Sequence, residues 1–403
     1  MKHKIKLLVI THTFPTKYNP IAAIFLLNQL EVLKKYCDIK VIFPYAYVPK
    51  IRFLNPYYRF SQIPSQEKIK GISVYHPKYF MIPRILFNIK FLHIYLFIES
   101  FFSYIASKKT AEIIVADWNP DIIHLHGSLS EGLLGVGLKR KHNKPLLITV
   151  YGEDITRFAK QAPSSYLAKF TLKNSDVIIC QSEFLENEIK KIGLKNKKFF
   201  IIPMGALTSK FKPRNKNSAR NILNLPKNKK IILFVGHLVT RKGVEYLIKA
   251  MGILIEKDKN ILCCVIGKGE LDENLRKLSS ELNIEPYILF LGQKTNEEVV
   301  PYMNACDILV LPSLNEGLPV ILCEALACGK PVVATNVAGN PEVINKDVGY
   351  LVKPKDENDL AEKIELALNK RWNIKKILER AKKFSVSSSA KKLFNVYNSL
   401  LKK

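Results

Sequence analysis

Residues Leu309–Val333 read LVLPSLNEGLPVILCEALACGKPVV, and this stretch decides the fold. The apolar run 308–311 predicts a buried strand of a parallel sheet, and Pro312 ends it. Residues 320–327 predict a helix that ends near Gly329, and the apolar run 332–334 starts the next strand. In open α/β sheets ligands bind at the carboxyl ends of the strands. We therefore expect the loop after residue 311 to face a ligand.

Two carboxylates stand eight residues apart in this stretch, Glu316 in the loop and Glu324 inside the helix. Glu324 interrupts an apolar segment, and a buried carboxylate without partners is costly, so a pair of sugar hydroxyls would satisfy it. The amides of Gly317 and Leu318 precede the helix, where backbone N–H groups and the helix dipole favour a phosphate. The alternative is an acidic helix start followed by one core glutamate that finds its partners within the protein.

The pair Glu316 and Glu324, followed by Ala-x-Ala-x-Gly-x-Pro-Val-Val-Ala, resembles the signature of the retaining GT-B glycosyltransferases of family 4, or glycosyl transferases group 1. The resemblance covers nearly the whole chain. It implies an α/β fold of GT-B architecture, with two Rossmann-like domains facing a central cleft and a C-terminal helix that crosses back to the first domain. It also implies that Glu324 holds the ribose hydroxyls of a nucleotide-sugar donor and that Glu316 holds hydroxyls of the donor sugar.

The length of 403 residues and the apolar fraction of 47% allow two domains of about 200 residues each. We expect the first domain at 1–205, completed by a C-terminal helix at 384–403, and the second at 206–383. Residues 206–230 contain two prolines and a lysine run and are typical of the connection between domains. Alternating strands and helices in both halves favour an α/β class.

The net charge of +28 favours acidic partners, and residues 1–109 hold 17 Lys and Arg against 4 Asp and Glu. A nucleic-acid binder is one reading of this charge, but no basic stripe alternates with aromatic residues as single-strand binding requires. An anionic membrane surface is the partner we favour for the first domain.

Seven scattered cysteines without a Cys-x-x-Cys pair indicate reduced, buried thiols in a cytoplasmic protein. The apolar run 5–10 is too short for a signal peptide and predicts the first strand. We expect a cytoplasmic location with peripheral attachment to the inner face of the membrane.

Residues 84–110, RILFNIKFLHIYLFIESFFSYIASKKT, form the most apolar stretch. Asn88, Lys90, His93 and Glu99 interrupt it, and charges at a bilayer centre are expensive, so we do not expect it to span a membrane. Two readings stay open: a helix packed on the sheet, or a helix or hairpin that lies on the membrane surface.

The first half carries three candidate site segments. The resemblance places a loop near the donor phosphates after the first strand, where this chain has Ala22-Ala23 in place of the usual glycine. It places Tyr151 where the family commonly has a histidine close to the reacting sugar, and Asp154 at a position that is acidic in the family. His124 and His126 end a predicted strand at 121–126, where core or turn histidines are the simpler interpretation. We could assign no chemistry to residues 44–83.

The second half carries a strand, a glycine turn with cations and a helix start, a pattern that predicts a diphosphate site. This segment contains Gly236, His237, Arg241 and Lys242. In the family the position of Lys242 is a lysine and that of His237 is usually an arginine. Further donor-binding candidates follow two later strands, namely Gly267, Gly269 and Gln293.

The expected function is therefore that of a hexosyltransferase-type glycosyltransferase, with a glycan or lipid-linked acceptor. The catalytic candidates are Glu316, Lys242, Tyr151 and Asp154. No Asp-x-Asp motif and no metal-ligand spacing occur, so we expect neither a metal nor a cofactor beyond the donor. A non-catalytic sugar-nucleotide binder and a sugar-nucleotide 2-epimerase are the alternatives.

Overall fold

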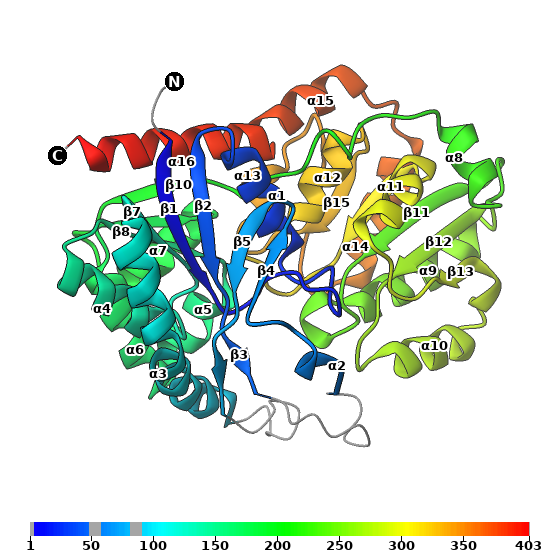
Figure 1. Ribbon diagram of the computed structural model, residues 1–403. Coiled ribbons are helices and arrows are strands. Elements are labelled where there is room, and N and C mark those ends of the chain that lie inside the picture. The colour runs from blue at the N-terminus through cyan, green and yellow to red at the C-terminus, as the bar shows by residue number, and fades with distance from the viewer. Residues whose placement is uncertain (1–3, 48–57, 81–90, 403) are drawn as a thin grey trace. The chain divides into compact units, whose positions relative to one another are not determined.

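The computed structural model describes residues 4–47, 58–80 and 91–402. These residues fall into two compact units (Figure 1). Unit 1 contains the chain up to Pro203 and again from Ser389 to the C-terminus, and unit 2 is the continuous stretch Met204–Ser388. The start of the expected helix at 84–110, residues 84–90, lies outside the described residues.

Unit 1 is built on an eight-stranded sheet in the order β10-β9-β8-β7-β1-β2-β5-β4. All neighbours run parallel except β4 and β5, which form an antiparallel pair. The central strands are continuous apolar runs because helices cover both faces of a parallel sheet. The strands are β1 (Ile5–Thr11), β2 (Cys37–Ile42), β4 (Gln66–Ile69), β5 (Ile72–Tyr75), β7 (Ile122–His126), β8 (Leu146–Val150), β9 (Val177–Cys180) and β10 (Phe199–Ile201), with a separate short pair β3 (Tyr45–Ala46) and β6 (Lys78–Tyr79).

The helices of unit 1 are α1 (Ile24–Leu33), α2 (Tyr58–Ser61), α3 (Leu92–Trp118), α4 (Gly132–His142), α5 (Glu153–Thr156), α6 (Ser164–Asn174) and α7 (Glu183–Lys191). The last helix, α16 (Val386–Leu401), enters unit 1 at Ser389. Tyr397 of α16 reaches β7, where its hydroxyl lies 2.8 Å from Nδ1 of the buried His124. Phe394 stacks on Tyr36 with 4.6 Å between ring centroids. The C-terminal residues therefore complete the packing of the unit that the N-terminal residues begin.

Unit 2 is a six-stranded, wholly parallel sheet in the order β13-β12-β11-β14-β15-β16. Its strands are β11 (Lys230–Val235), β12 (Ile261–Ile266), β13 (Ile288–Phe290), β14 (Ile308–Leu311), β15 (Val332–Thr335) and β16 (Gly349–Val352). Its helices are α8 (Lys216–Ile222), α9 (Val244–Lys257), α10 (Asp272–Glu281), α11 (Asn296–Ala305), α12 (Val320–Ala327), α13 (Asn340–Val343), α14 (Glu357–Asn369) and α15 (Ile374–Lys383).

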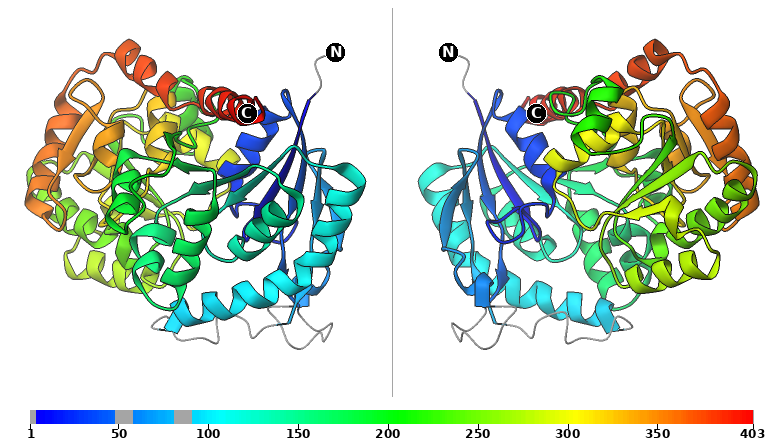
Figure 2. Two further views of the ribbon diagram at one scale, coloured as in Figure 1. Left: turned by 90° about the vertical axis from the view of Figure 1, so that its left-hand side faces the viewer. Right: turned by 90° about the vertical axis from the view of Figure 1, so that its right-hand side faces the viewer.

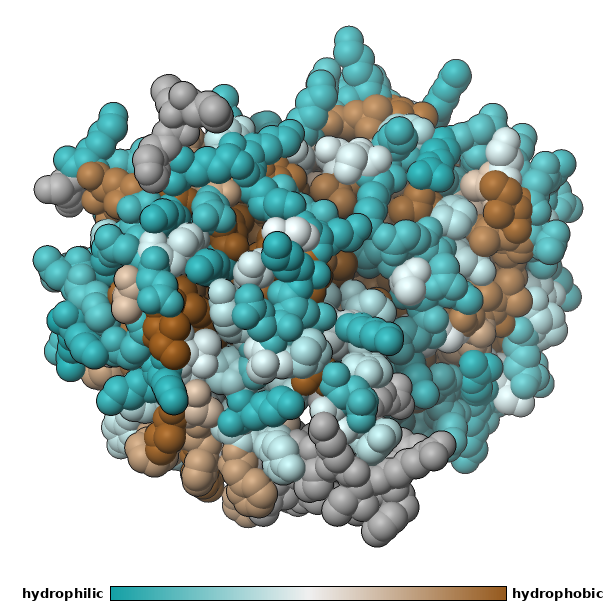
Figure 3. Space-filling model, in the orientation of Figure 1, coloured by the Kyte–Doolittle hydropathy of each residue, from teal (hydrophilic) through white to brown (hydrophobic). Residues whose placement is uncertain are grey.

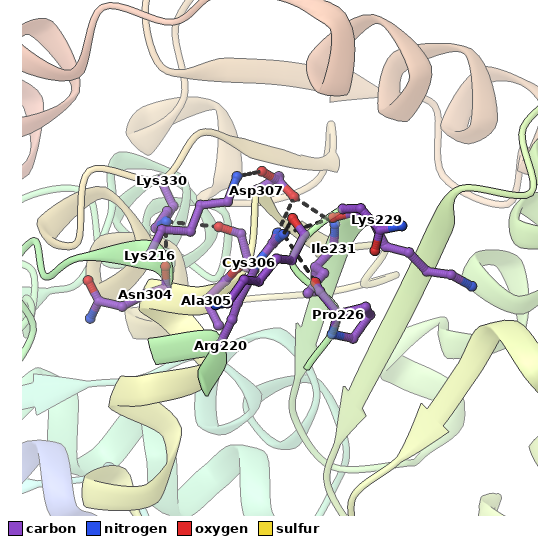
Figure 4. A network of polar contacts seen from close by, with 12 residues as sticks. Lys216, Arg220, Pro226, Lys229, Ile231, Asn304, Ala305, Cys306, Asp307 and Lys330 are labelled. Carbon is purple, nitrogen blue, oxygen red and sulfur yellow. Dashed lines mark hydrogen bonds and ion pairs between the residues drawn. The ribbon is translucent and has the colours of Figure 1, made fainter. Parts of the chain in front are cut away.

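A buried arginine fixes the start of unit 2 (Figure 4). Arg220 of α8 is 1% exposed, and its guanidinium donates to Asp307 and to four backbone carbonyls, those of residues 226, 227, 229 and 305. Asp307 also accepts hydrogen bonds from Lys216 and from the amide of Ile231. Residues 206–230, which we expected to connect the two domains, belong to unit 2 and contain α8, which is anchored to the sheet of that unit.

The α/β class and the two parallel sheets are confirmed, and β14 and α12 have the predicted bounds. Residues 44–83, to which we assigned nothing, contribute β3 to β6 and α2, including the antiparallel edge strand β4. The apolar stretch forms α3, which extends eight residues past the expected end at 110. Within the described part of the chain, no helix combines the length and the apolarity that crossing a bilayer requires.

Candidate functional site

The strand order of unit 2 marks one place for a ligand. From β11 the chain proceeds outward to β12 and β13, and then returns to the other side of β11 with β14. The loops that follow the adjacent strands β11 and β14 therefore leave the sheet in opposite directions. A place where the strand order reverses in this way is a switch point, and it opens a crevice at the carboxyl edge of the sheet. Loop 236–243 and loop 312–319 carry seven of the predicted residues.

Glu316 is held at this switch point by a cluster of polar side chains. The side chain of Glu316 is 7% exposed, and its Oε1 accepts hydrogen bonds from Lys242 and, at 2.7 Å, from Ser313. A guanidinium nitrogen of Arg241 lies 3.8 Å from Oε2. The structure thus brings together three residues that the sequence singled out separately, and the carboxylate is fixed in a direction before any ligand arrives.

Glu324 has a different environment, although it lies only eight residues further on. It is 8% exposed on α12, among apolar neighbours, and burial raises the pKa of its carboxyl from 4.5 to about 8, while the positive charge of Lys210 lowers it slightly. No donor from the described residues bonds this carboxylate. The predicted alternative of a satisfied core glutamate therefore has no support in the geometry, and the group carries the cost of burial without a partner.

The glycine turns of the site are required by close approach of the backbone. A Cβ on Gly267 would lie 1.9 Å from the carbonyl oxygen of Gly236, and one on Gly269 would lie 2.2 Å from that of Leu238. The turns after β11 and β12 are thus packed main chain against main chain. Their glycines have a structural reason that is sufficient without a ligand, so we retain Gly236, Gly267 and Gly269 as donor-binding residues only as a prediction.

The remaining predicted residues of unit 2 lie around the same edge of the sheet. His237 and Gln293 are exposed, Gly317 is half-buried and Leu318 is buried. Helix α12 begins after Pro319 and has no side-chain cap at its N-terminus. The first amides of α12 are therefore not occupied by a capping side chain, as an anion site at that helix end requires.

Unit 1 has a switch point of its own, between β1 and β7. His12 follows β1 and Glu131 ends the loop after β7, and the two are joined twice: Glu131 Oε1 accepts from the amide of His12 at 2.9 Å and from its ring Nδ1. The side chain of Glu131 is 1% exposed, whereas that of His12 is 41% exposed. The second oxygen of Glu131 is buried without a hydrogen-bond partner.

Tyr151 and Asp154 follow the neighbouring strand β8. The Tyr151 hydroxyl bonds Nδ1 of His126, and burial together with the charges of Asp154 and Glu131 raises the tyrosine pKa well above 10. Asp154 Oδ1 accepts from the amides of Gly152 and Tyr151, yet burial raises its pKa to about 6. Burial lowers the pKa of His126 well below 6.5, so this histidine is neutral near pH 7.

Within the described part of the chain, three buried polar atoms of this cluster have no hydrogen-bond partner: Oε2 of Glu131, Oδ2 of Asp154 and Nε2 of His126. Buried polar groups are nearly always hydrogen-bonded, so unpaired atoms at a sheet switch point indicate a polar ligand. A molecule rich in hydroxyl groups, each both donor and acceptor, matches two carboxylate oxygens and a ring nitrogen. By contrast, His124 is a core histidine, since Tyr397 and Thr149 occupy its two ring nitrogens.

The sequence analysis missed His12 and Glu131. The sequence held only a weak signal for them. Glu131 is an acidic residue in the loop after one predicted strand, and His12 is a histidine directly after another predicted strand. Strand order decides that these loops are neighbours, and it was not known in advance. No group of three potential metal ligands occurs within residues 4–47, 58–80 and 91–402.

Two family models match the chain in succession. Residues 66–210 match the model described as Glycosyltransferase Family 4, and residues 215–384 match the one described as Glycosyl transferases group 1. The matched segments contain all the catalytic and donor-binding candidates, whereas the loop with Ala22-Ala23 precedes them.

Curated proteins agree with these models. The putative teichuronic acid biosynthesis glycosyltransferase TuaC of Bacillus subtilis is 30% identical over 366 residues, which cover 89% of this chain and 88% of TuaC. An Escherichia coli UDP-Gal:alpha-D-GlcNAc-diphosphoundecaprenol alpha-1,3-galactosyltransferase is 30% identical over 251 residues, or 59% of this chain and 63% of that enzyme. Among solved structures, sucrose-phosphate synthase from Thermosynechococcus elongatus superposes with a TM-score of 0.78 over 98% of this chain and 99% of that one, at 23% identity. That similarity shows a shared fold.

Proposed function

Because the chain belongs to the glycosyltransferases of group 1 and family 4, we propose that it moves a sugar from a nucleotide-sugar donor to a hydroxyl acceptor with retention of the anomeric configuration. Unit 2 binds the donor. The polar cluster of unit 1, with its buried carboxylate oxygens and ring nitrogen, binds a ligand rich in hydroxyl groups.

The observation that carries this proposal is the unpaired, buried carboxylate of Glu324. The adjacent hydroxyls of a ribose can donate to both oxygens of one carboxylate, which offsets the burial cost of the charge. Glu316, oriented by Lys242 and Ser313, then accepts from hydroxyls of the donor sugar. Glu324 can accept two hydrogen bonds, and Glu316 is already oriented. This pair of carboxylates suits a ligand that has hydroxyl groups at both of its ends.

The chemistry at the anomeric carbon follows from the charges on the same edge. Breaking the bond between this carbon and the diphosphate oxygen leaves negative charge on the leaving group. The ammonium of Lys242 and the guanidinium of Arg241 lie beside the helix start of α12, and cations and backbone N–H groups stabilise such developing charge. The acceptor oxygen then bonds to the anomeric carbon on the same face, and its proton passes to the departing diphosphate oxygen, which leaves as nucleotide diphosphate. The family resemblance supports retention, with the new bond on the same face of the sugar as the old one.

We propose a lipid-linked or polysaccharide precursor as the acceptor and the inner face of an anionic membrane as the place of work. The named relatives support this reading, since one is assigned to teichuronic acid biosynthesis and the other to a diphosphoundecaprenol acceptor. We propose no metal or further cofactor.

The test is donor binding by wild type and by Glu324→Ala, followed as thermal shift with UDP-, GDP-, ADP- and dTDP-sugars. Loss of a charge-assisted hydrogen bond should weaken binding of the preferred donor by about 1.5–3 kcal/mol, or roughly 10- to 150-fold. Glu256→Ala in the last turn of α9 is the control, because it removes an exposed glutamate of the same unit at the end of the helix far from loop 236–243. Equal donor affinity in wild type and Glu324→Ala would refute the assignment.

Turnover separates the proposed reaction from its alternatives. A transferase releases nucleotide diphosphate in proportion to glycosylated acceptor. Free epimerised sugar formed without an acceptor would identify a 2-epimerase, and tight donor binding without any turnover on a panel of acceptors would favour a non-catalytic binder.

A further inference from the structure

Helix α3 carries its large apolar side chains on the outside. Between residues 91 and 105 the exposed positions are all Phe or Ile, namely Phe91, Ile94, Phe97, Ile98, Phe101, Phe102 and Ile105. The inward positions over the same turns include a glutamate and three serines, as the buried set Tyr95, Leu96, Glu99, Ser100, Ser103 and Ser107 shows. A helix that packs on a sheet normally has the reverse arrangement, with its apolar stripe facing the core.

The outward residues form one continuous face. At about 100° of rotation per residue, the seven positions fall within an arc of about 140°, and from residue 91 to residue 105 they extend roughly 21 Å along the helix axis. We call this face the α3 stripe. Half of the sixteen exposed large apolar side chains in the described part of the chain lie between residues 91 and 113. In Figure 3, brown and tan atoms gather at the lower left, where Figure 1 draws α3.

Some of the inward polar side chains of α3 form hydrogen bonds within unit 1. Glu99 accepts a hydrogen bond from the Tyr79 hydroxyl at 2.7 Å, and Ser100 donates to the carbonyl of Phe97 at 2.6 Å. Glu99 is thus fixed inside and is only 4% exposed. Consequently no acidic side chain points outward from the α3 stripe, and the orientation of the helix is held by specific polar contacts.

The stripe ends in positive charge. Lys108 and Lys109 are exposed, and by the same rotation they continue the outward face. The next outward residue, Glu112, accepts from Lys141 and from His142 at the end of α4, so its charge is balanced. Apolar side chains followed by lysines are what an interfacial helix presents to an anionic bilayer.

We propose that the α3 stripe docks on an anionic lipid bilayer, with α3 lying in the plane of the interface. Its Phe and Ile side chains enter the boundary between headgroups and acyl chains, and Lys108 and Lys109 meet lipid phosphates. Figure 2 shows α3 in cyan along the lower edge of unit 1, outside its sheet. The inference deepens the proposed function by naming its membrane-binding surface, and it rests on that function only for the choice of a lipid-linked acceptor.

A second copy of the chain is a poorer occupant. Two stripes packed in parallel would bring the lysine pairs together, and antiparallel packing would set each pair against the apolar end of the other stripe. An anionic bilayer satisfies both parts of the stripe at once. We therefore commit to the lipid surface, and self-association becomes an outcome of the test.

The experiment is co-sedimentation of the full chain with vesicles of phosphatidylcholine alone and of phosphatidylcholine mixed with phosphatidylglycerol. We expect wild type to bind the anionic vesicles and the triple variant Phe97→Ser/Phe101→Ser/Ile105→Ser to bind at least tenfold more weakly. These side chains are exposed, so their replacement leaves the core intact. The matched control is Ile222→Ser/Ile374→Ser, which removes exposed isoleucines from unit 2 and should bind like wild type.

A second variant, Lys108→Glu/Lys109→Glu, should lose the preference for anionic vesicles. Equal binding by wild type and the triple variant would overturn the proposal, as would a dimer that dissociates on the same substitutions without any dependence on lipid. The donor thermal shift separates this inference from the proposed function. A normal shift without vesicle binding refutes the docking surface alone, and vesicle binding without a shift refutes the donor site alone.

Discussion

The substitution Glu324→Gln should make the free protein more stable at alkaline pH. Glu324 is buried without a donor, and its pKa is raised from 4.5 to about 8. A group whose pKa is higher in the folded state holds its proton more tightly there, so the free energy of unfolding is greatest below pH 4.5 and falls as pH rises towards 8. Above that pH the whole penalty is present. Glutamine keeps the shape of the protonated carboxyl and does not ionise.

The size of the effect follows from the two pKa values. Each pKa unit is worth about 1.4 kcal/mol, so between pH 5 and pH 8 the wild type loses about 3–4 kcal/mol that the variant keeps. For a unit of 185 residues, Met204–Ser388, this corresponds to a difference in melting temperature that grows by about 7–14 °C over the same interval. Donor binding by the wild type should instead become tighter as the pH rises, since only the ionised carboxylate of Glu324 accepts from two hydroxyls.

The assay is a melting curve of wild type and Glu324→Gln at half-unit steps from pH 5 to pH 9, with Glu256→Gln as the control for loss of one exposed charge. Subtracting the curves at each pH cancels all other titrating groups. Donor affinity of the wild type should rise about fivefold from pH 7 to pH 8, as the ionised fraction of a group with a pKa of 8 increases from roughly a tenth to a half. A difference between wild type and variant that stays constant with pH would refute the argument.

Substitutions at three further positions test the structure. Arg220→Met should lower the stability of unit 2 by about 3–5 kcal/mol in urea unfolding, because it breaks a buried ion pair with Asp307 and leaves carbonyl groups without a donor; a loss below about 1 kcal/mol would contradict the network. Tyr151→Phe should cost about 1–3 kcal/mol by removing the hydroxyl partner of the buried His126, and unchanged stability would mean that the contact contributes nothing. Ala23→Gly should leave the melting temperature equal or higher, whereas Ala23→Val should lower it, because Ala23 has a left-handed backbone with φ of 43°; the reverse order would contradict that conformation.

Much of the fold was predictable because the sheets are parallel. The run 308–311 is apolar throughout and the run 146–150 is apolar apart from Thr149, which is what burial on both faces imposes on a strand. The edge hairpin β4–β5 was missed, since the alternating pattern of Gln66–Ile69 is short and its strand is half-exposed. The inward serines of α3 were beyond prediction for a related reason: the direction of a helix face is set by its neighbours, here Tyr79 of β6, and not by its own composition.

The candidate site was predicted where residues lie close in sequence. Glu316 and Glu324 belong to one loop and helix, so spacing alone related them. Glu131 and His12 are separated by more than a hundred residues, and only the β1–β7 pairing makes them neighbours. Ala23 illustrates another limit, since an alanine in left-handed backbone leaves no mark in the sequence, whereas a glycine there would have suggested a turn.

The division of the chain has a consequence for its synthesis. Unit 2 is continuous and can fold once residue 388 has left the ribosome, whereas unit 1 waits for residues 389–403, which carry Tyr397 into its core. All strands of the unit 1 sheet are made early, but its core stays partly uncovered, and so open to chaperones and proteases, until these residues arrive. A premature stop after residue 388 would therefore leave unit 2 complete but would prevent unit 1, although it is made first, from completing its fold.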